Sequence, residues 1–399
     1  MNGLESKAAI DFTDPFAGIR EPRDIPAMTP ANRSVRFLAT GDPQYNNSDI
    51  DSGVNSGRAE LADIGMAGIK QFMRENDDVR GILVNGDMTQ NARGDDGDID
   101  VGKSSNEFDA FKAAMGGQRP FFFEGLGNHD VESTGSTSDP GDVRQFVREK
   151  PRATVDTFRG VESNQTDPHY SWDWHDVHVV QLDVFPGNDP QTTPSTGGDF
   201  SGIDPRNALD YLMIDLALTV GSSGRPVVLN HHYGFEQATI DYGWWTEEDL
   251  VAYWNAIRTY NVVAIFFGHT HLSTGTAWQN VAVPFRYPAG AFARPDGRGC
   301  IPAFNGAAIF SGNFLDVEIS SSLVDIQVRD AFASGDPVVA RFLYPPTSTR
   351  ISVSTDFNTA ENDSIQCPEP GQLALLLPGI GALAFLGRKR TAPRRSRRG

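Results

Sequence analysis

One motif in the middle of the chain constrains the fold more than any other stretch. Residues 120–130 read PFFFEGLGNHD, so an apolar, aromatic run is followed by glycines and then by an amide, an imidazole and a carboxylate. The apolar half is typical of a buried strand, and Gly125 and Gly127 allow the backbone to turn sharply after it. The motif predicts a strand that delivers three reactive side chains to the edge where open α/β folds bind ligands.

The same arrangement recurs at four other predicted strand ends. The five polar clusters are Asp42 with Gln44, Asp87, Asn128 with His129 and Asp130, His231 with His232, and His269 with His271. A single histidine after a strand is more often structural than a ligand. Here five of the eight histidines fall in these clusters, which indicates one shared site.

Strand and helix patterns alternate between these clusters. Helical spacing predicts helices over residues 59–76, 106–115, 143–152, 206–219 and 247–260. Strands are predicted from residue 35, over residues 80–85 and 226–229, twice within 169–184, and before Gly268. The alternation up to residue 271 predicts a largely parallel α/β core. The later hairpins predict a second sheet that packs against the first.

Charge and cysteine content exclude two classes of site. The chain has 52 acidic and 34 basic residues, and seven of the basic residues lie in the last twelve positions. The rest of the chain is strongly acidic and should repel nucleic acid, so no nucleic acid partner is expected. Cys300 and Cys367 are the only cysteines, which excludes a thiolate zinc site but leaves a disulfide between them open.

The donor types in the five clusters point to metal-dependent chemistry. Oxygen and nitrogen donors without thiolate suit Mn, Fe, Zn or Mg. The clusters hold enough donors for two divalent metal ions that share a carboxylate. Two ions about 3.5–4 Å apart are the usual active-site arrangement in enzymes that catalyse displacement at phosphorus. Such a pair binds the phosphoryl oxygens and lowers the pKa of a bridging water, whose hydroxide form attacks.

The motifs GDPQ, GD, GNHD, the histidine pair and GHTH stand in the order found in the calcineurin-like metallophosphoesterase superfamily, which residues 35–330 resemble. The resemblance implies an α/β fold with two packed mixed β-sheets flanked by helices, in four layers, over residues 35–345. It also implies a phosphate-ester substrate, and both monoesters and diesters stay open.

The same resemblance implies a role for each site residue. Asp87 would bridge the two metals, and the other ligands would be Asp42, Gln44 and His271 at the first ion and Asn128, His231 and His269 at the second. His129 would be the general acid, oriented by Asp130. His232 would be a substrate-binding or supporting group.

Gln44 departs from the usual pattern, which has histidine at this position. An amide oxygen is a weaker donor than imidazole, so the first ion should be held less tightly, and Mn²⁺ is favoured over Fe or Zn. A subset of the superfamily carries this Asp-Pro-Gln form, so activity is still expected. The alternative is a surface-attached binding protein that keeps the fold without turnover, but such a protein has no need of His129 and Asp130.

The C-terminal end of the chain predicts export, although the N-terminal end lacks the signal peptide that normally goes with it. Residues 1–34 form a polar extension without a signal-peptide core, and residues 346–366 form a Ser/Thr-rich linker. Residues 367–399 hold CPEP, a short apolar transmembrane segment at 373–386 and an arginine cluster, which resembles the PEP-CTERM sorting signal of Gram-negative bacteria. That resemblance implies an exosortase-type processing enzyme as partner. The protein would be held in the membrane by its tail and then released to the cell envelope or the exterior.

Overall fold

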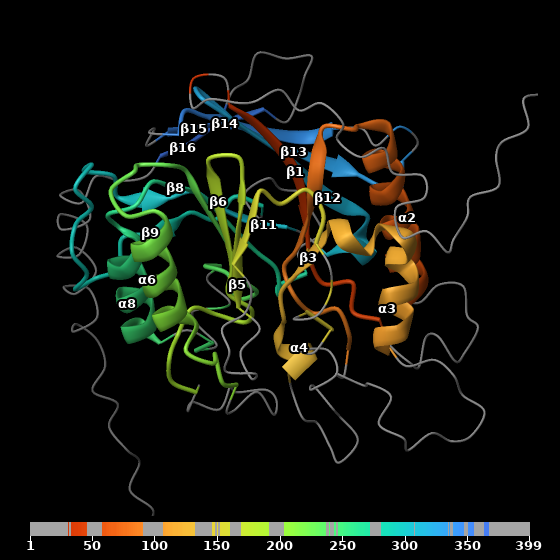
Figure 1. Cartoon of the computed structure of the whole chain (residues 1–399), viewed down its shortest axis with the longest axis horizontal. Coiled ribbons are helices and arrows are strands. Elements are labelled where there is room, and N and C mark those ends of the chain that lie inside the picture. The colour runs from red at the N-terminus through yellow and green to blue at the C-terminus, as the bar shows by residue number, and fades with distance from the viewer. Residues whose placement is uncertain are drawn as a thin grey trace, which may run out of the picture.

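The structure is a computed structural model of the chain, shown in Figure 1. Two β-sheets lie face to face, and helices cover the outer face of each sheet (Figure 1). The structure describes residues 31, 33–45, 58–90, 107–131, 146–147, 150, 152–159, 169–190, 203–236, 239, 243–244, 246–271, 281–306, 308–333, 335, 338–346, 350–354 and 363–366.

The larger sheet has eight strands in the order β16-β15-β14-β13-β12-β1-β2-β3. β1, β2 and β3 run parallel, whereas β12 pairs antiparallel with the other side of β1 and begins a run of hairpins. The bounds are β1 (Ser34–Thr40), β2 (Val79–Val84), β3 (Phe122–Glu124), β12 (Asn313–Ser320), β13 (Val324–Asp330), β14 (Val338–Tyr344), β15 (Arg350–Ser354) and β16 (Asp363–Gln366).

The second sheet has six strands in the order β11-β8-β7-β6-β5-β4. β6, β7, β8 and β11 are parallel, and β4 and β5 complete the other edge as antiparallel strands. The bounds are β4 (Thr157–Arg159), β5 (Tyr170–Trp174), β6 (Val177–Gln181), β7 (Val227–Asn230), β8 (Val262–Phe267) and β11 (Ala303–Asn305). A small additional sheet pairs β9 (Phe285–Arg286) with β10 (Cys300–Ile301).

The longer helices pack on the outer faces of the sheets. Phe72 of helix α2 packs on Phe314 of the eight-stranded sheet, with 5.4 Å between the ring centroids. On the other side, Leu212 and Trp254 belong to one buried cluster with Val227 and Ile265 of the six-stranded sheet. The helices are α2 (Arg58–Glu75), α3 (Glu107–Met115), α4 (Asn128–Val131), α6 (Ala208–Thr219) and α8 (Glu247–Ile257), with short 3-10 turns η2 (Gly116–Phe121) and η4 (Ile309–Ser311).

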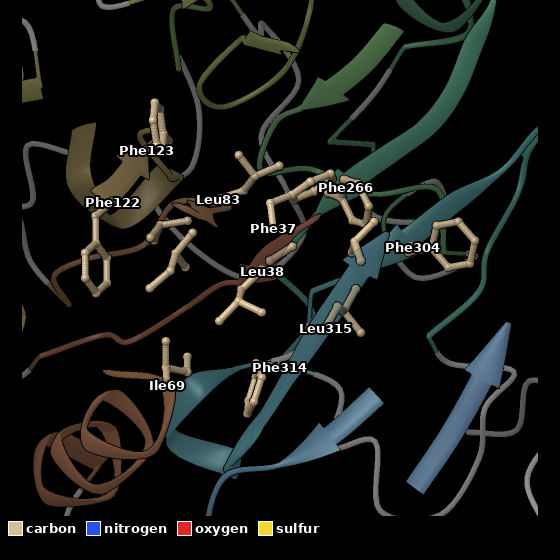
Figure 2. Packing of buried hydrophobic residues seen from close by; sticks show 14 of the residues in the cluster. Phe37, Leu38, Ile69, Leu83, Phe122, Phe123, Phe266, Phe304, Phe314 and Leu315 are labelled. Carbon is tan, nitrogen blue, oxygen red and sulfur yellow. The ribbon is translucent and has the colours of Figure 1, made fainter. Parts of the chain in front are cut away.

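Aromatic side chains fill the space between the two sheets. Phe37 of β1 meets Phe266 of β8 edge-on at 5.7 Å, and the ring of Phe123 in β3 stacks on Trp172 of β5 at 4.4 Å. Successive strand residues point to opposite faces, so in Figure 2 Phe37 points toward Phe266 while Leu38 points toward the side of Ile69 in α2. Each strand near the site is therefore buried on both faces, which accounts for its continuous apolar sequence.

The predicted fold class is confirmed, but the assignment of strands to sheets was partly wrong. The later hairpins do not form the second sheet; they extend the first one through the pairing of β12 with β1. The parallel strands are instead divided between the two sheets. Strand pairing between distant segments is a property of the whole chain, so local periodicity carries no signal for it.

The C-terminal part departs from the predicted linker. β15 and β16 lie within residues 346–366 and add two strands to the edge of the eight-stranded sheet. Cys300 is buried in β10 and disulfide-bonded, while Cys367 lies outside the described residues. Among the described residues no helix has the length and apolar character needed to cross a membrane. The predicted N-terminal extension (residues 1–34) is described only in part, and the predicted tail (367–399) not at all.

We expect Phe123→Ala to lower the free energy of unfolding by about 3–5 kcal/mol, because it removes a fully buried ring from between the sheets. Urea titration measures the loss. Leu218→Ala on α6 is the matched control, since Leu218 is 82% exposed and its removal should change stability by less than ~0.5 kcal/mol. Equal effects of the two substitutions would contradict the inter-sheet packing described here.

Candidate functional site

The predicted site residues all follow strands that run in parallel, but they come from both sheets. The loops after β1, β2 and β3 of the eight-stranded sheet carry Asp42, Gln44, Asp87 and Asn128. The loops after β7 and β8 of the six-stranded sheet carry His231, His232, His269 and His271. The site therefore lies where the carboxyl ends of strands from the two sheets meet, the location expected for a ligand site in an α/β fold.

The backbone at several of these positions is held in the left-handed region. The φ angles are 49° at Asp42, 42° at Gln44, 51° at Asp87, 75° at His269 and 49° at His271. A non-glycine residue with positive φ is uncommon and costs free energy, and such residues cluster at functional sites. The surrounding structure must therefore hold these loops in place.

Hydrogen bonds between the loops provide that support. The Asp42 N–H donates to the Gly86 carbonyl at 3.1 Å, and the Gln44 N–H donates to the Asp87 carbonyl at 2.9 Å. Across the sheets, the His269 N–H donates to the Asp42 carboxylate at 3.0 Å. The loops after β1, β2 and β8 are thus tied together directly.

Two groups of donor atoms meet at this edge and share Asp87. One group is Asp87, His232 and His269, and the other is Asp42, Asp87 and His271; within each group the donor atoms lie within 4.8 Å of one another. The Nε2 atoms of His269 and His271 are buried and have no hydrogen-bond partner among the described residues. Oxygen and imidazole donors at this spacing fit a pair of divalent metal ions.

The structure places His232, and not His231, among the donor groups. His231, predicted as a ligand, belongs to neither donor group, and its ring lies edge-on to Phe235 and Tyr253 at 5.7 and 5.6 Å. His232 lies in the site instead: its Nδ1 donates to the Asn85 carbonyl at 2.7 Å, and its Nε2 lies 3.3 Å from Asp87 Oδ2. Neighbouring residues leaving a strand point to opposite sides, so only one of the pair can face the site.

The two amide residues predicted as ligands also lie in the site. Gln44 is fully buried, and its Nε2 donates to Asp87 Oδ2 at 3.1 Å. Asn128 Oδ1 lies 2.9 Å from His232 Nε2. Both amides therefore contact members of the donor groups.

His129 is positioned differently from the prediction. Its Nδ1 donates to the Gln90 carbonyl at 2.8 Å, whereas the Asp130 carboxylate accepts from the N–H groups of Met88, Thr89 and Gly127. Asp130 therefore joins the loop after β2 to the loop after β3 and does not orient the His129 ring. Gln90, which the sequence analysis did not single out, does so.

A second residue missed from the sequence is Glu236. Its buried carboxylate accepts from Thr270 Oγ1 at 2.8 Å and from Asn305 Nδ2 at 2.7 Å, which supports the loop that carries His269 and His271. Trp244 covers the same loop, with its ring 4.0 Å from that of His269. Glu236 lies outside every strand-end motif, so no pattern marked it.

The end of β6 carries a further supporting pair that the sequence analysis overlooked. Asp183 Oδ1 accepts from the Leu126 N–H at 2.9 Å, and Asp183 Oδ2 lies 2.9 Å from His169 Nδ1. Asp183 also has a positive φ of 54°. A polar residue directly after a buried strand was the signal available for it, the same signal that identified the ligands.

Burial and charge set the protonation of the site. Burial alone would raise the pKa of Asp87, but the charges of His232 and His129 hold it well below its usual range. Burial opposes the charged form of His232, yet the Asp87 carboxylate raises its pKa to about 9. Burial lowers the pKa of His269 well below its usual value, which keeps its imidazole neutral. A metal ion bound by His232 Nε2 would have to displace the proton from that atom.

The comparisons with known proteins cover the part of the chain that holds these residues. The family model described as calcineurin-like phosphoesterase matches residues 35–273, and no curated protein matches the chain. Among solved structures, one titled "Structure of PhoD" is 11% identical with a TM-score of 0.43. The match covers 86% of this chain and 73% of the PhoD chain. The calcineurin-like phosphoesterase YfkN from Bacillus subtilis is 14% identical with a TM-score of 0.34. The match covers 84% of this chain and 90% of the YfkN chain. Both TM-scores are below 0.5, so neither structure adds to the functional argument.

We expect His232→Gln to weaken the binding of one metal ion by at least ~100-fold, because it removes an imidazole that faces Asp87. His231→Phe is the matched control on the adjacent residue: it keeps an aromatic ring against Phe235 and Tyr253 and should leave both ions in place. Elemental analysis and Mn²⁺ titration of each variant measure the difference. Loss of an ion from His231→Phe alone would contradict the placement of these residues.

Proposed function

The chain belongs to the calcineurin-like phosphoesterase family, whose model matches more than half of its length, and on this premise we propose that it hydrolyses phosphate monoesters or diesters with two divalent metal ions. The observation that carries the proposal is the pair of donor groups that share Asp87. Two ions that share a carboxylate are suited to displacement at phosphorus. When bound, they would hold the phosphoryl oxygens and lower the pKa of a water molecule.

Each of the two proposed ions would take ligands from both sheets. With Asp87, one ion would be held by Asp42, Gln44 and His271 and the other by Asn128, His232 and His269. Gln44 offers an amide where the family usually has imidazole, so we propose that the ion on its side is the more weakly held and that Mn²⁺ is preferred there. The Asp42 and Asp87 carboxylates supply the negative charge that a pair of divalent ions requires.

His129 is our proposed general acid. It lies beside the donor groups: its backbone N–H donates to Asp87 Oδ1 at 2.9 Å. The residue is only partly buried. The Gln90 carbonyl accepts from Nδ1 and holds a proton on that atom. In the imidazolium form Nε2 carries the second proton, which is the one available to a leaving oxygen.

A hydrolysis screen with Mn²⁺-loaded protein tests the proposal. The substrates are 4-nitrophenyl phosphate, bis(4-nitrophenyl) phosphate, nucleotides and phospholipid head groups. Hydrolysis of any of these, lost on chelation and restored by Mn²⁺, is the expected result. A protein that holds two ions per chain and hydrolyses none of them would favour the binding-protein alternative.

We expect His129→Ala to keep both ions and to lose about 10²–10⁴-fold in kcat on esters with poor leaving groups, because their oxygen needs a proton as it departs. The loss should shrink with 4-nitrophenyl esters, whose leaving group is stable as the anion. Steady-state kinetics over a series of leaving groups checks this. A loss of the same size across the series would assign His129 a positioning role.

We further propose that the chain is exported and processed at its C-terminal tail. Residues 367–399 lie outside the described residues, so this proposal rests on the sequence: the CPEP motif, the apolar segment 373–386 and the arginine cluster. The short apolar segment would hold the chain in the membrane while the basic residues stay on the cytoplasmic side. Cleavage near Pro368 and Pro370 would then release the acidic body of the protein.

We expect replacement of the seven terminal basic residues by Gln to disrupt membrane retention and processing and to leave the ester hydrolysis rate unchanged. The residues are Arg388, Lys389, Arg390, Arg394, Arg395, Arg397 and Arg398. Cell fractionation and intact-mass measurement in a host with an exosortase report the outcome. Unprocessed protein confined to the cytoplasm of that host would exclude the proposed signal.

A further inference from the structure

The two donor groups are assembled from two separate sheets, which sets a positioning problem. Asp87 follows a strand of the eight-stranded sheet, whereas His232 and His269 follow strands of the six-stranded sheet. Much of the packing between the sheets, for example Phe123 on Trp172, is apolar and has no directional preference comparable to a hydrogen bond. A metal site needs its ligands held to within about 0.5 Å. Apolar packing alone gives no such control.

A buried chain of three side-chain amides crosses between the sheets directly beneath the site. Asn85 Nδ2 donates to Asn230 Oδ1, and Asn230 Nδ2 donates to Gln181 Oε1. All three residues are fully buried. Asn85 directly follows β2 of the eight-stranded sheet, while Asn230 and Gln181 are the last residues of β7 and β6 and are paired in register. We call Asn85, Asn230 and Gln181 the carboxamide ladder.

The carboxamide ladder is connected to the donor groups at both sheets. Asn85 is two residues before Asp87, and its backbone carbonyl accepts from His232 Nδ1 at 2.7 Å. Asn230 is two residues before His232. A shift of one sheet against the other would therefore break the ladder and, at the same time, move Asp87 away from His232.

Glycines leave the space that the carboxamide ladder occupies. A Cβ atom at Gly125 would lie 1.7 Å from Gln181 Nε2, and one at Gly306 would lie 2.2 Å from Asn85 Oδ1. Gly125 belongs to the EGLGNHD segment that delivers Asn128 and His129. The glycine of this motif thus makes room for a side chain from the opposite sheet.

The carboxamide ladder is a poor source of stability. Asn85 Oδ1 and Gln181 Nε2 are buried without a hydrogen-bond partner among the described residues. An unpaired buried polar atom costs more than a typical hydrogen bond contributes, and an apolar core of the same shape would be as stable or more so. What amides provide and apolar groups lack is a defined donor–acceptor geometry.

We propose that the carboxamide ladder positions the metal centre by fixing Asp87 of one sheet against His232 of the other. Asn85, Asn230 and Gln181 are positioning residues that act through Asp87 and His232. This inference rests on the proposed function, because it concerns the same pair of ions.

The test is a titration of Mn²⁺ into the metal-free full chain, so it needs no substrate. Asn230→Leu and Gln181→Met keep the side-chain volume and break the ladder, and each should weaken Mn²⁺ binding by about 10–100-fold, the range for residues that orient metal ligands. Tyr344→Phe is the matched control. Tyr344 also joins the two sheets, through a hydrogen bond from its hydroxyl to the Val263 carbonyl at 2.9 Å. Val263 lies near the start of β8, four residues and about 13 Å before the strand ends at Phe267, at ~3.3 Å per residue.

A combined variant separates positioning from stability. Asn85→Leu with Asn230→Leu and Gln181→Met removes every ladder amide, so no member is left unpaired, and urea stability should recover relative to Asn230→Leu. Mn²⁺ affinity should stay low in this variant, and the electron paramagnetic resonance signal of the Mn²⁺ pair should differ from that of the wild type.

The outcomes are distinct. Wild-type affinity in Asn230→Leu and Gln181→Met would overturn the inference, as would a loss of equal size in Tyr344→Phe. Recovery of Mn²⁺ affinity in step with stability in the combined variant would also overturn it. A wild-type chain that binds no Mn²⁺ would overturn the proposed function and the inference with it, whereas tight wild-type binding with unaffected ladder variants would overturn the inference alone.

Discussion

The buried carboxylate of Asp87 is the interaction on which the rest of the site depends. Its Oδ1 accepts from the His129 N–H, and its Oδ2 accepts from Gln44 Nε2 and faces His232 Nε2. A Cβ atom at Gly127 would lie only 2.1 Å from Oδ1, so the GNHD loop can close over this carboxylate only with glycine there. Because a buried charge must be compensated, the elements that meet at Asp87 are held together by the need to satisfy it.

This dependence explains which parts of the site could be predicted from the sequence. Each parallel strand is buried on both faces and ends in polar residues, so a local pattern marks Asp42, Asp87, Asn128 and His269. The family resemblance then supplied their roles. The local pattern could not decide between His231 and His232, because a shift of one residue at a strand end exchanges the two faces and both positions hold the same residue type.

The site residues and strand pairings that the sequence analysis did not predict were missed for one physical reason. Gln90, Glu236 and the carboxamide ladder act through partners far away in sequence, such as Asn85 with Asn230, 145 residues apart. A single polar residue in a loop looks the same whether it supports a ligand or faces water. The assignment of strands to sheets failed for a similar reason, since the pairing of β1 with β12 leaves no trace in either strand's own periodicity.

That pairing has a consequence for how the chain folds. β1, at residues 34–40, lies between β2 and β12, and β12 spans residues 313–320, so the centre of the eight-stranded sheet joins the two ends of the folded body. Contacts of such large sequence separation form slowly, because a long loop must close before they contribute. Until residue 320 has left the ribosome, one edge of β1 has no partner strand, and an unpaired edge is prone to aggregation. The late closure of this sheet therefore leaves one edge of β1 without its partner strand for most of the chain's synthesis.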